Sequence, residues 1–276
     1  MLTCIHKKPM KLIILVTFIL LTSILKSNSQ TLDTVMKTSN YSLHFNIIKG
    51  NGVPILFESG GGDDGQVWNN LLTLIHQEIV ATLITYDRVG FGKSPLDTVG
   101  LNITTEVESL EEGLKKLGYG SNYFLVSHSL GGSYAMVFAS RNKGKVTGGV
   151  FIDVNTPCFM TEENTKKIIA AYDPELSTLK KEKPGVYYLL KYYQLNNRKM
   201  LEAARTLNIP LTVIGSDIPP YKGTDSLKWK NCLREFALKR PNRKYIMAKH
   251  TGHYVFFDDP KLVTKEIISL YRSSSL

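Results

Sequence analysis

The chain has 276 residues, of which 43% are hydrophobic and 21% charged, and Lys and Arg outnumber Asp and Glu by 34 to 24, a net charge of +10. This composition excludes a disordered chain, which would have fewer apolar residues, and a polytopic membrane protein, which would have several apolar runs of about 20 residues. The length allows two ordinary domains or one large α/β domain with an insertion.

Residues 1–29 have the three regions of a secretory signal peptide. Three lysines precede an apolar stretch at 12–25, and a polar segment that ends at Ser29 follows it. The apolar stretch is shorter than the ~20 residues of a transmembrane helix, so cleavage after Ser29 is favoured over an uncleaved anchor, although Lys26 is unusual so near a cleavage site. We therefore expect a secreted or periplasmic protein that has no membrane contact after cleavage.

Without residues 1–29 the chain keeps 30 basic and 24 acidic residues, a net charge of +6. The remaining basic residues are scattered, and no interleaving of arginine with aromatic residues indicates a nucleic-acid surface. We expect a small-molecule partner and no nucleic acid, and the oligomeric state stays open.

Strand and helix patterns alternate along the rest of the chain. Two strand patterns at 41–48 and 53–58, joined by a glycine-containing turn, predict a hairpin. Further elements are predicted at 67–75 (helix), 80–86 (strand), 104–117 (helix), 123–126 (strand), 130–141 (helix) and 146–152 (strand). Such alternation predicts an α/β fold with a mainly parallel central sheet and helices on both faces.

A segment at 155–205 interrupts this pattern with Lys-rich and Tyr-rich helical stretches and no convincing strand. The alternation then resumes with a strand at 209–214, a helix at 226–238, a strand at 244–247 and a helix at 260–271. We therefore interpret 30–154 and 206–276 as the two parts of one core, and 155–205 as a small helical insertion.

The most informative stretch runs from Phe124 to Gly132, where an apolar strand, a tight turn of small residues and a helix follow one another. Such a turn projects the hydroxyl of Ser129 above the sheet edge, and small residues at Ser127 and Gly131 let the backbone approach itself closely. The stretch resembles the nucleophile elbow, G-x-S-x-G, of the α/β-hydrolase superfamily, with Ser127 in place of the first glycine. The alternative interpretation is that Ser129 only caps the helix.

The resemblance extends from about residue 40 to the C-terminus, and it implies an α/β-hydrolase fold in which 155–205 is a cap over the site. Glu58-Ser-Gly-Gly-Gly62 resembles the oxyanion loop of the superfamily, whose glycine-rich bend presents a backbone N–H to the nucleophile. The resemblance assigns this donor to Gly61, with Gly60 and Gly62 as alternatives. It assigns the second donor to the N–H of Leu130.

The segment 86–94 resembles a structural loop of the same superfamily, Asp-x-Arg-Gly-x-Gly-x-Ser. Its end also resembles a phosphate-binding P-loop, but that motif needs glycine at position 87, where the chain has Asp87, and Pro95 stands where a helix should begin. Nucleotide binding is therefore disfavoured.

A serine nucleophile needs an imidazole as base and a carboxylate that orients the imidazole. The Gly252-His253 pair, between the last predicted strand and the final helix, matches the late Gly-His of the superfamily and makes His253 the predicted base. His250 is interpreted as an ordinary loop histidine. His128 is interpreted as a packing residue whose side chain points away from the hydroxyl.

Two aspartates are candidates for the acid. Asp217 follows the strand that reopens the sheet after the insertion, which is the usual place in the superfamily. Asp153 ends the preceding strand, where some relatives have their acid but where a structural aspartate is also common. Asp217 is favoured over Asp153.

Three cysteines, Cys4, Cys158 and Cys232, are too few for a disulfide framework, and no Cys/His cluster indicates zinc. We expect no metal and no cofactor. Free buried thiols at 158 and 232 are favoured over a bridge, because the sequence does not show whether their Cα atoms come within reach. Tyr187, Tyr188, Tyr192 and Tyr193 of the insertion either line an apolar pocket or pack the insertion on the core.

The sequence therefore favours an exported serine hydrolase that cleaves a carboxylic ester, lactone or amide through an acyl-enzyme on Ser129. The first alternative is a non-catalytic ligand-binding protein on the same scaffold, because fold alone does not establish chemistry. The second is an acyltransferase or a haloperoxidase-type member of the superfamily.

Overall fold

The computed structural model describes residues 30–274. The predicted signal peptide at 1–29 lies outside the described residues. Within 30–274, no helix combines the length and the apolar character that crossing a membrane requires.

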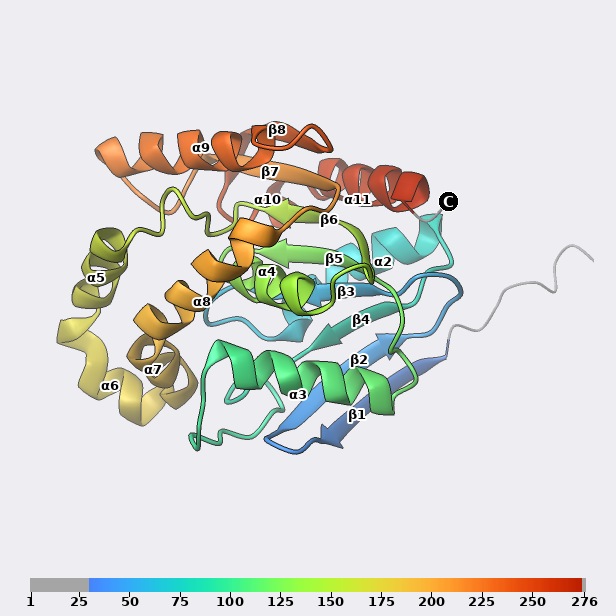
Figure 1. The fold of residues 1–276 in the computed structure, drawn as a ribbon, viewed down its shortest axis with the longest axis horizontal. Coiled ribbons are helices and arrows are strands. Elements are labelled where there is room, and N and C mark those ends of the chain that lie inside the picture. The colour runs from blue at the N-terminus through green and yellow to red at the C-terminus, as the bar shows by residue number, and fades with distance from the viewer. Residues whose placement is uncertain (1–29, 275–276) are drawn as a thin grey trace, which may run out of the picture. The chain divides into compact units, whose positions relative to one another are not determined.

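A mostly parallel sheet forms the centre of the fold (Figure 1). Its strand order is β1-β2-β4-β3-β5-β6-β7-β8, and pairing is antiparallel for β1–β2 and β2–β4 and parallel from β4 onward. The strands are β1 (Thr31–Lys37), β2 (Ser42–Ile48), β3 (Ile55–Glu58), β4 (Leu83–Tyr86), β5 (Tyr123–His128), β6 (Val146–Ile152), β7 (Leu211–Ile218) and β8 (Arg243–Gly252).

The predicted hairpin between 41–48 and 53–58 is wrong. Both segments are strands, but β2 pairs with β1 and β4, while β3 lies between β4 and β5 in parallel register. All four residues of β3 are buried, and a strand buried on both faces belongs in the middle of a parallel sheet. The sequence prediction also missed β1, whose alternate residues are exposed.

Helices cover both faces of the sheet. The helices α3, α4 and α9 contact one face, with α8 packed on α3 and α4, and α2 and α11 pack together on the other face. The helices are α2 (Asn69–Glu78), α3 (Ile103–Lys116), α4 (Gly131–Arg141), α5 (Glu162–Ala171), α6 (Leu176–Glu182), α7 (Pro184–Lys191), α8 (Tyr193–Thr206), α9 (Gly223–Leu238), α10 (Val255–Asp258) and α11 (Pro260–Ser274), with short 3-10 turns at η1 (Gly65–Trp68) and η2 (Asp173–Glu175).

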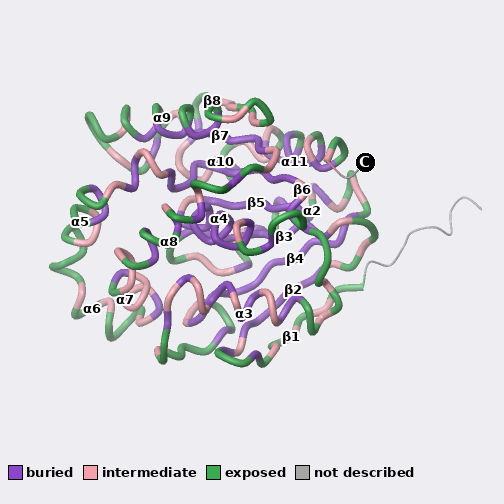
Figure 2. The backbone as a smooth tube through the Cα atoms, in the orientation of Figure 1, coloured by how far each residue is buried: buried purple, intermediate pink, exposed green. Residues whose placement is uncertain are grey.

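The two faces have separate hydrophobic cores because successive strand side chains point to opposite faces. In β5, Leu125 joins the core under α3 and α4, whereas Phe124 and Val126 join the core under α2 and α11. Figure 2 shows the central strands buried and the outer helix surfaces exposed. A strand buried on both faces carries no polar alternation, which explains why the sequence shows these segments as continuous apolar runs.

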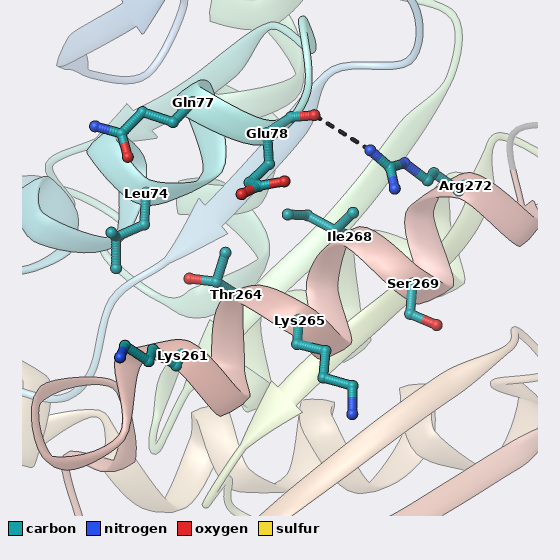
Figure 3. Close-up of a pocket in the computed structure, with 9 residues that line it drawn as sticks. All are labelled: Leu74, Gln77, Glu78, Lys261, Thr264, Lys265, Ile268, Ser269 and Arg272. Carbon is teal, nitrogen blue, oxygen red and sulfur yellow. Dashed lines mark hydrogen bonds between the residues drawn. The ribbon is translucent and has the colours of Figure 1, made fainter.

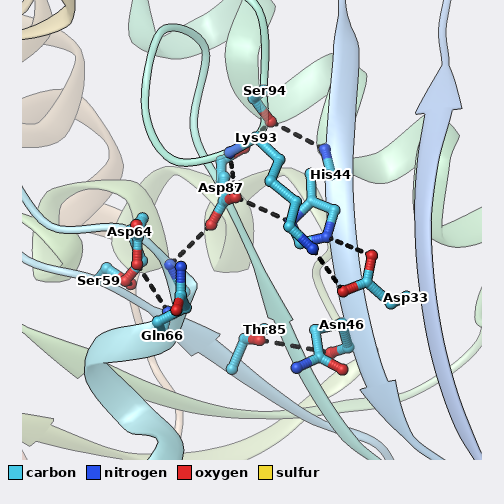
Figure 4. Close-up of polar contacts among 11 residues, drawn as sticks. Asp33, His44, Asn46, Ser59, Asp64, Gln66, Thr85, Asp87, Lys93 and Ser94 are labelled. Atoms are coloured by element: carbon cyan, nitrogen blue, oxygen red, sulfur yellow. Dashed lines mark hydrogen bonds and ion pairs between the residues drawn. The ribbon is translucent and has the colours of Figure 1, made fainter.

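Asp87 organises the loop that follows β4 (Figure 4). Its carboxylate accepts the backbone N–H of Gly65 and of Lys93, both at 2.8 Å, and contacts a ring nitrogen of His44. A Cβ on Gly92 would collide with this carboxylate, and Gly92 has a φ of +52°. A phosphate-binding loop would present the backbone amide of Lys93 to its ligand, but here that amide is hydrogen-bonded to Asp87.

The segment from 155 to 206 forms α5 to α8. Figure 1 shows α5, α6 and α7 at one end of the sheet, and α8 runs from there to pack on α4. The segment is joined to α9 by a disulfide between Cys158 and Cys232, whose Cα atoms are 5.3 Å apart. The prediction of two free thiols is therefore wrong. The two cysteines are 74 residues apart in the chain, and only the packing of α9 against the segment after β6 brings them within reach.

Candidate active site

Ser129 lies in the sharp turn between β5 and α4. Its φ of +53° lies in the left-handed region, which non-glycine residues rarely occupy. The turn lets α4 begin two residues after the serine, at Gly131. A Cβ on Gly131 would collide with the carbonyl groups of Glu58 and Ser59, so the close approach of α4 to the end of β3 requires a glycine there.

Ser129 and His253 form a hydrogen-bonded pair although 124 residues separate them. Residue 253 directly follows β8, and its Nε2 lies 2.9 Å from the Ser129 Oγ. The other ring nitrogen, Nδ1, lies 2.7 Å from Oδ2 of Asp153. Because a carboxylate only accepts hydrogen bonds, Nδ1 carries the proton and Nε2 is free to accept the serine hydroxyl proton.

Asp153 is held rigidly behind the imidazole. It directly follows β6, has a φ of +47°, and its side chain is fully buried. Oδ1 accepts the backbone N–H of Ser216 at 3.0 Å and the indole N–H of Trp229 at 2.9 Å. Oδ2 accepts the Ser216 hydroxyl at 2.8 Å as well as His253. Four donors thus fix the orientation of one carboxylate.

The prediction that Asp217 orients the imidazole is wrong for this structure. Asp217 lies further along β7, and its side chain is 42% exposed. It contacts the Lys230 ammonium at 3.3 Å and accepts the backbone N–H of His250 at 3.3 Å. These two interactions lower the pKa of Asp217, the His250 amide contributing most. Asp153, the alternative in the sequence prediction, occupies the place beside His253.

Gly61 and Leu130 line the same cavity as Ser129. Arg88, which is buried, donates to the carbonyl oxygens of Ser59 and Gly60. The peptide bonds are trans, and in a trans unit the N–H points opposite to the carbonyl, so the N–H of Gly61 points away from Arg88. Within residues 30–274 neither the Gly61 nor the Leu130 N–H has a protein acceptor.

These groups line one cavity of about 260 Å³. Its wall includes Ser129, His253, Gly61 and Leu130 from the core and Leu189 from α7. In the part of the chain that the structure describes, no cluster of three or more His, Cys, Asp or Glu side chains could hold a metal ion. The chemistry that these residues offer is therefore that of a hydroxyl, an imidazole, a carboxylate and two amides.

Comparison with known proteins identifies the fold. The model of the alpha/beta hydrolase fold family matches residues 53–184. A solved hydrolase of E-2-(acetamidomethylene)succinate is 16% identical, with a TM-score of 0.67 over 88% of this chain and 100% of the other. The chain has the α/β-hydrolase fold. An esterase from Thermogutta terrifontis is also similar, with 17% identity and a TM-score of 0.61 over 90% of this chain and 100% of the esterase.

Among curated proteins, this α/β-hydrolase is similar to the uncharacterized protein YqjL of Bacillus subtilis strain 168. The two are 27% identical over 235 residues, which cover 80% of this chain and 84% of YqjL. At these identities the solved structures establish the fold of the α/β-hydrolase and leave its substrate to be argued from its own residues.

His128 packs beside the imidazole of His253. Its side chain is 1% exposed, and its ring centroid lies 4.5 Å from that of His253. Burial lowers the pKa of His128 well below its usual value, and the nearby His253 adds to this effect. Its Nε2 donates to the carbonyl oxygen of His253 at 3.1 Å. His250, in contrast, lies in β8 with a φ of +62° and uses its backbone to bind Asp217.

Sequence analysis missed several residues around the site. Trp229 and Ser216 hold Asp153, and neither lies in a recognisable motif, although the chain has only two tryptophans. Of the four predicted tyrosines, Tyr193 lines the cavity of Ser129, whereas Tyr188 and Tyr192 line a small separate cavity. Asp63 and Tyr254 also line the cavity.

A larger cavity of about 700 Å³ lies between α2 and α11, away from these residues (Figure 3). Charged side chains of both signs line it, including Glu78, Lys265 and Arg272, and Arg272 donates to the carbonyl oxygen of Glu78. Its lining contains the hydroxyls of Thr264 and Ser269 but no histidine. Because this lining has no counterpart of the hydrogen-bonded Ser129, His253 and Asp153, the cavity is not the candidate active site.

Proposed function

We propose that the protein is a serine hydrolase that cleaves a carboxylic ester, lactone or amide of a small acyl substrate through an acyl-enzyme on Ser129. The observation that carries the proposal is the relay of two short contacts, 2.9 Å from Ser129 to His253 and 2.7 Å from His253 to Asp153, at the wall of a cavity. This is the arrangement that turns a weakly nucleophilic hydroxyl into an attacking group.

In the first half of the reaction, Ser129 Oγ attacks the carbonyl carbon while its proton passes to Nε2 of His253. The carbonyl π-electrons move to the oxygen, which forms a tetrahedral oxyanion. When the oxyanion collapses, the bond to the leaving group breaks and His253 gives its proton to the departing oxygen or nitrogen. From an ester or amide the alcohol or amine leaves, whereas from a lactone the new hydroxyl remains on the acyl chain; in each case the acyl group stays on Ser129.

In the second half, a water molecule gives a proton to His253 Nε2 and its oxygen attacks the acyl carbon. Collapse of this second oxyanion breaks the bond to Ser129 Oγ, which takes the proton back from His253. Asp153 keeps the proton on Nδ1 and stabilises the imidazolium that forms in both halves. The N–H groups of Gly61 and Leu130 are the donors proposed for both oxyanions.

The experiment that tests this proposal compares Ser129→Ala with wild type on p-nitrophenyl butyrate and with a fluorophosphonate probe. We expect the loss of turnover to be on the order of 10⁴-fold or more, and the loss of covalent labelling to be complete. Ser140→Ala is the matched control, because Ser140 lies on α4 and its hydroxyl bonds only the carbonyl of Val137. Comparable turnover by Ser129→Ala would refute the proposal.

We also propose that residues 1–29 direct export and are removed after Ser29. The disulfide between Cys158 and Cys232 supports this, because disulfides persist in oxidising compartments outside the cytosol. Mass spectrometry of the protein recovered from secreted or periplasmic fractions should give a chain that starts at Gln30. Recovery of the full-length chain from the cytosol alone would contradict export.

A further inference from the structure

Asp63 is the one carboxylate in the lining of the cavity that contains Ser129, and that lining includes no lysine or arginine. The carboxylate is half-buried, and each of its oxygens lies 3.2 Å from the hydroxyl of Tyr254. A hydroxyl has a single proton, so it satisfies one of the two oxygens. Among residues 30–274 no cation forms an ion pair with Asp63. The guanidinium of the nearby Arg88 donates its hydrogen bonds to backbone carbonyls instead.

The pKa of Asp63 is raised above its ordinary value, and burial of the carboxylate is the largest cause. Removing a carboxylate from water without a countercharge is unfavourable. The carboxylate therefore lies where a cation from outside the chain would stabilise it.

A second unpaired acceptor lies beside this carboxylate. Because His128 donates from Nε2 to a backbone carbonyl, its Nδ1 is an acceptor, and within the described residues this buried atom has no hydrogen-bond partner. His128 also lines the cavity. The point where Gly60 would carry a Cβ is 2.7 Å from Asp63 Oδ2 and 2.8 Å from His128 Nδ1. Because this point is one bond from the Gly60 Cα, Asp63 and His128 are neighbours packed against Gly60, and His128 Nδ1 is not open to the cavity.

Aromatic rings make up much of the remaining wall. Tyr172, Tyr221, Trp229 and Tyr254 all line the cavity, and the ring of Tyr254 lies 4.7 Å from that of His128. The faces of tyrosine and tryptophan rings attract cations through their quadrupoles. An aromatic wall with one carboxylate favours a positive group over a neutral one and disfavours a negative group.

We propose that this cavity selects acyl substrates that carry a primary ammonium group, with Asp63 as the countercharge. The proposal rests on the hydrolase function above and names its substrate class. A primary ammonium has three N–H donors, and one of them can bond the Asp63 oxygen that the Tyr254 hydroxyl leaves unsatisfied. A substrate carboxylate at the same place would meet the like charge of Asp63.

The test uses three p-nitrophenyl esters of nearly equal size, those of β-alanine (cationic), butyric acid (neutral) and succinic acid as its monoester (anionic). For the wild-type chain, kcat/KM divided by the uncatalysed rate should be about 10- to 100-fold higher for the β-alanine ester than for butyrate, the range expected for one charge-assisted hydrogen bond. The succinate ester should be the slowest of the three.

The variant Asp63→Asn should bring the ratio between the β-alanine and butyrate esters close to one. Asp64→Asn is the matched control, because Asp64 is the neighbouring residue, caps η1 by accepting the N–H of Gln66, and is absent from the cavity lining. Asparagine also caps helices well, so this control should keep the wild-type ratio. A ratio that Asp63→Asn leaves unchanged would overturn the role of Asp63.

The outcomes separate this proposal from the hydrolase proposal. If the esters are hydrolysed through Ser129 but the wild type does not favour the cationic one, the ammonium site is wrong and the hydrolase remains. If no ester is hydrolysed, calorimetry with β-alaninamide and butyramide decides. Tighter binding of β-alaninamide that is lost in Asp63→Asn supports the site, and equal binding of the two amides refutes it.

Discussion

Asp153 and Asp217 differ in burial and in their partners. Asp153 is fully buried with four hydrogen-bond donors, whereas Asp217 is exposed and contacts Lys230 at the surface. Only the first can fix the ring of His253 in one tautomer, because orientation requires a carboxylate that cannot rotate.

We therefore predict that Asp153→Asn lowers kcat by about 10³- to 10⁴-fold, because the amide favours the wrong imidazole tautomer. Asp217→Asn should change kcat by less than about threefold, since it removes only an exposed ion pair. Steady-state rates on p-nitrophenyl butyrate measure both, with thermal unfolding as the check that each variant is folded. Equal losses in the two variants would contradict the assignment.

Sequence motifs led to Ser129 and His253 because each lies in a short segment of characteristic spacing, and the structure places the two in contact. The acid could not be chosen in the same way. Asp153 follows β6 and Asp217 lies near the end of the adjacent strand β7, and the difference between them depends on the indole of Trp229 and on the packing of α9. Both are long-range features that no local pattern records.

At the scale of elements, α9 joins the site to the insertion. It carries Trp229, which donates to Asp153, and Cys232, which is bonded to Cys158 just after β6. The disulfide thus joins α9, which orients the Asp153 carboxylate, to the segment that contains Asp153 and Cys158. Spacing in the sequence gave no sign of this pair, because their separation of 74 residues is bridged only by tertiary packing.

We predict that replacing both cysteines, Cys158→Ser with Cys232→Ser, lowers the free energy of unfolding by about 2 to 4 kcal/mol, since the bridge restricts a long loop in the unfolded chain. Urea unfolding with and without a reductant measures the effect. Reductant should destabilise the wild type by a similar amount and leave the double variant unchanged. If the wild type is equally stable under both conditions, the bridge is not formed in solution.

The strands show which elements a sequence pattern predicts well. The strand at 146–152 was predicted with the bounds that the structure shows for β6, because a buried apolar run ends sharply at flanking polar residues. The pairing of β2 and β3 was not predictable in this way. Their partner β4 comes later in the chain, and a short turn between two strands suggested a hairpin that the burial of β3 on both faces forbids.

At the scale of the whole molecule, a buried polar network links the sheet to the helices that cover it. Glu58 at the end of β3 accepts the hydroxyl of Tyr86 from β4 at 2.8 Å, and Glu106 of α3 accepts the hydroxyl of Tyr134 from α4 at 2.6 Å. The guanidinium of Arg88 lies near both and contacts the ring of Tyr134. Arg88 connects this network to the proposed oxyanion loop, because it donates to the carbonyl oxygens of Ser59 and Gly60.

Burial dominates the ionisation of both carboxyl groups. It raises the pKa of Glu58 to about 8 and that of Glu106 to about 7, although Arg88 and the tyrosine hydroxyls act in the opposite direction. The folded protein therefore keeps a proton on Glu58 at pH values where the unfolded chain, with a pKa near the ordinary 4.5, has lost it.

The sign of the pH dependence follows from this difference. The contribution of Glu58 to stability is complete below pH 4.5 and is lost as the pH rises through about 8, because the folded state binds more protons than the unfolded state in that window. Between pH 5 and 9 we predict that the wild type loses on the order of 3 to 4 kcal/mol of unfolding free energy relative to Glu58→Gln, which has no proton to lose.

Urea unfolding at several pH values measures the difference, and Glu175→Gln, at an exposed position, is the control that should follow the wild type. A constant difference between wild type and Glu58→Gln across this range would mean that Glu58 is ionised in the folded protein throughout, and that Arg88 compensates its burial.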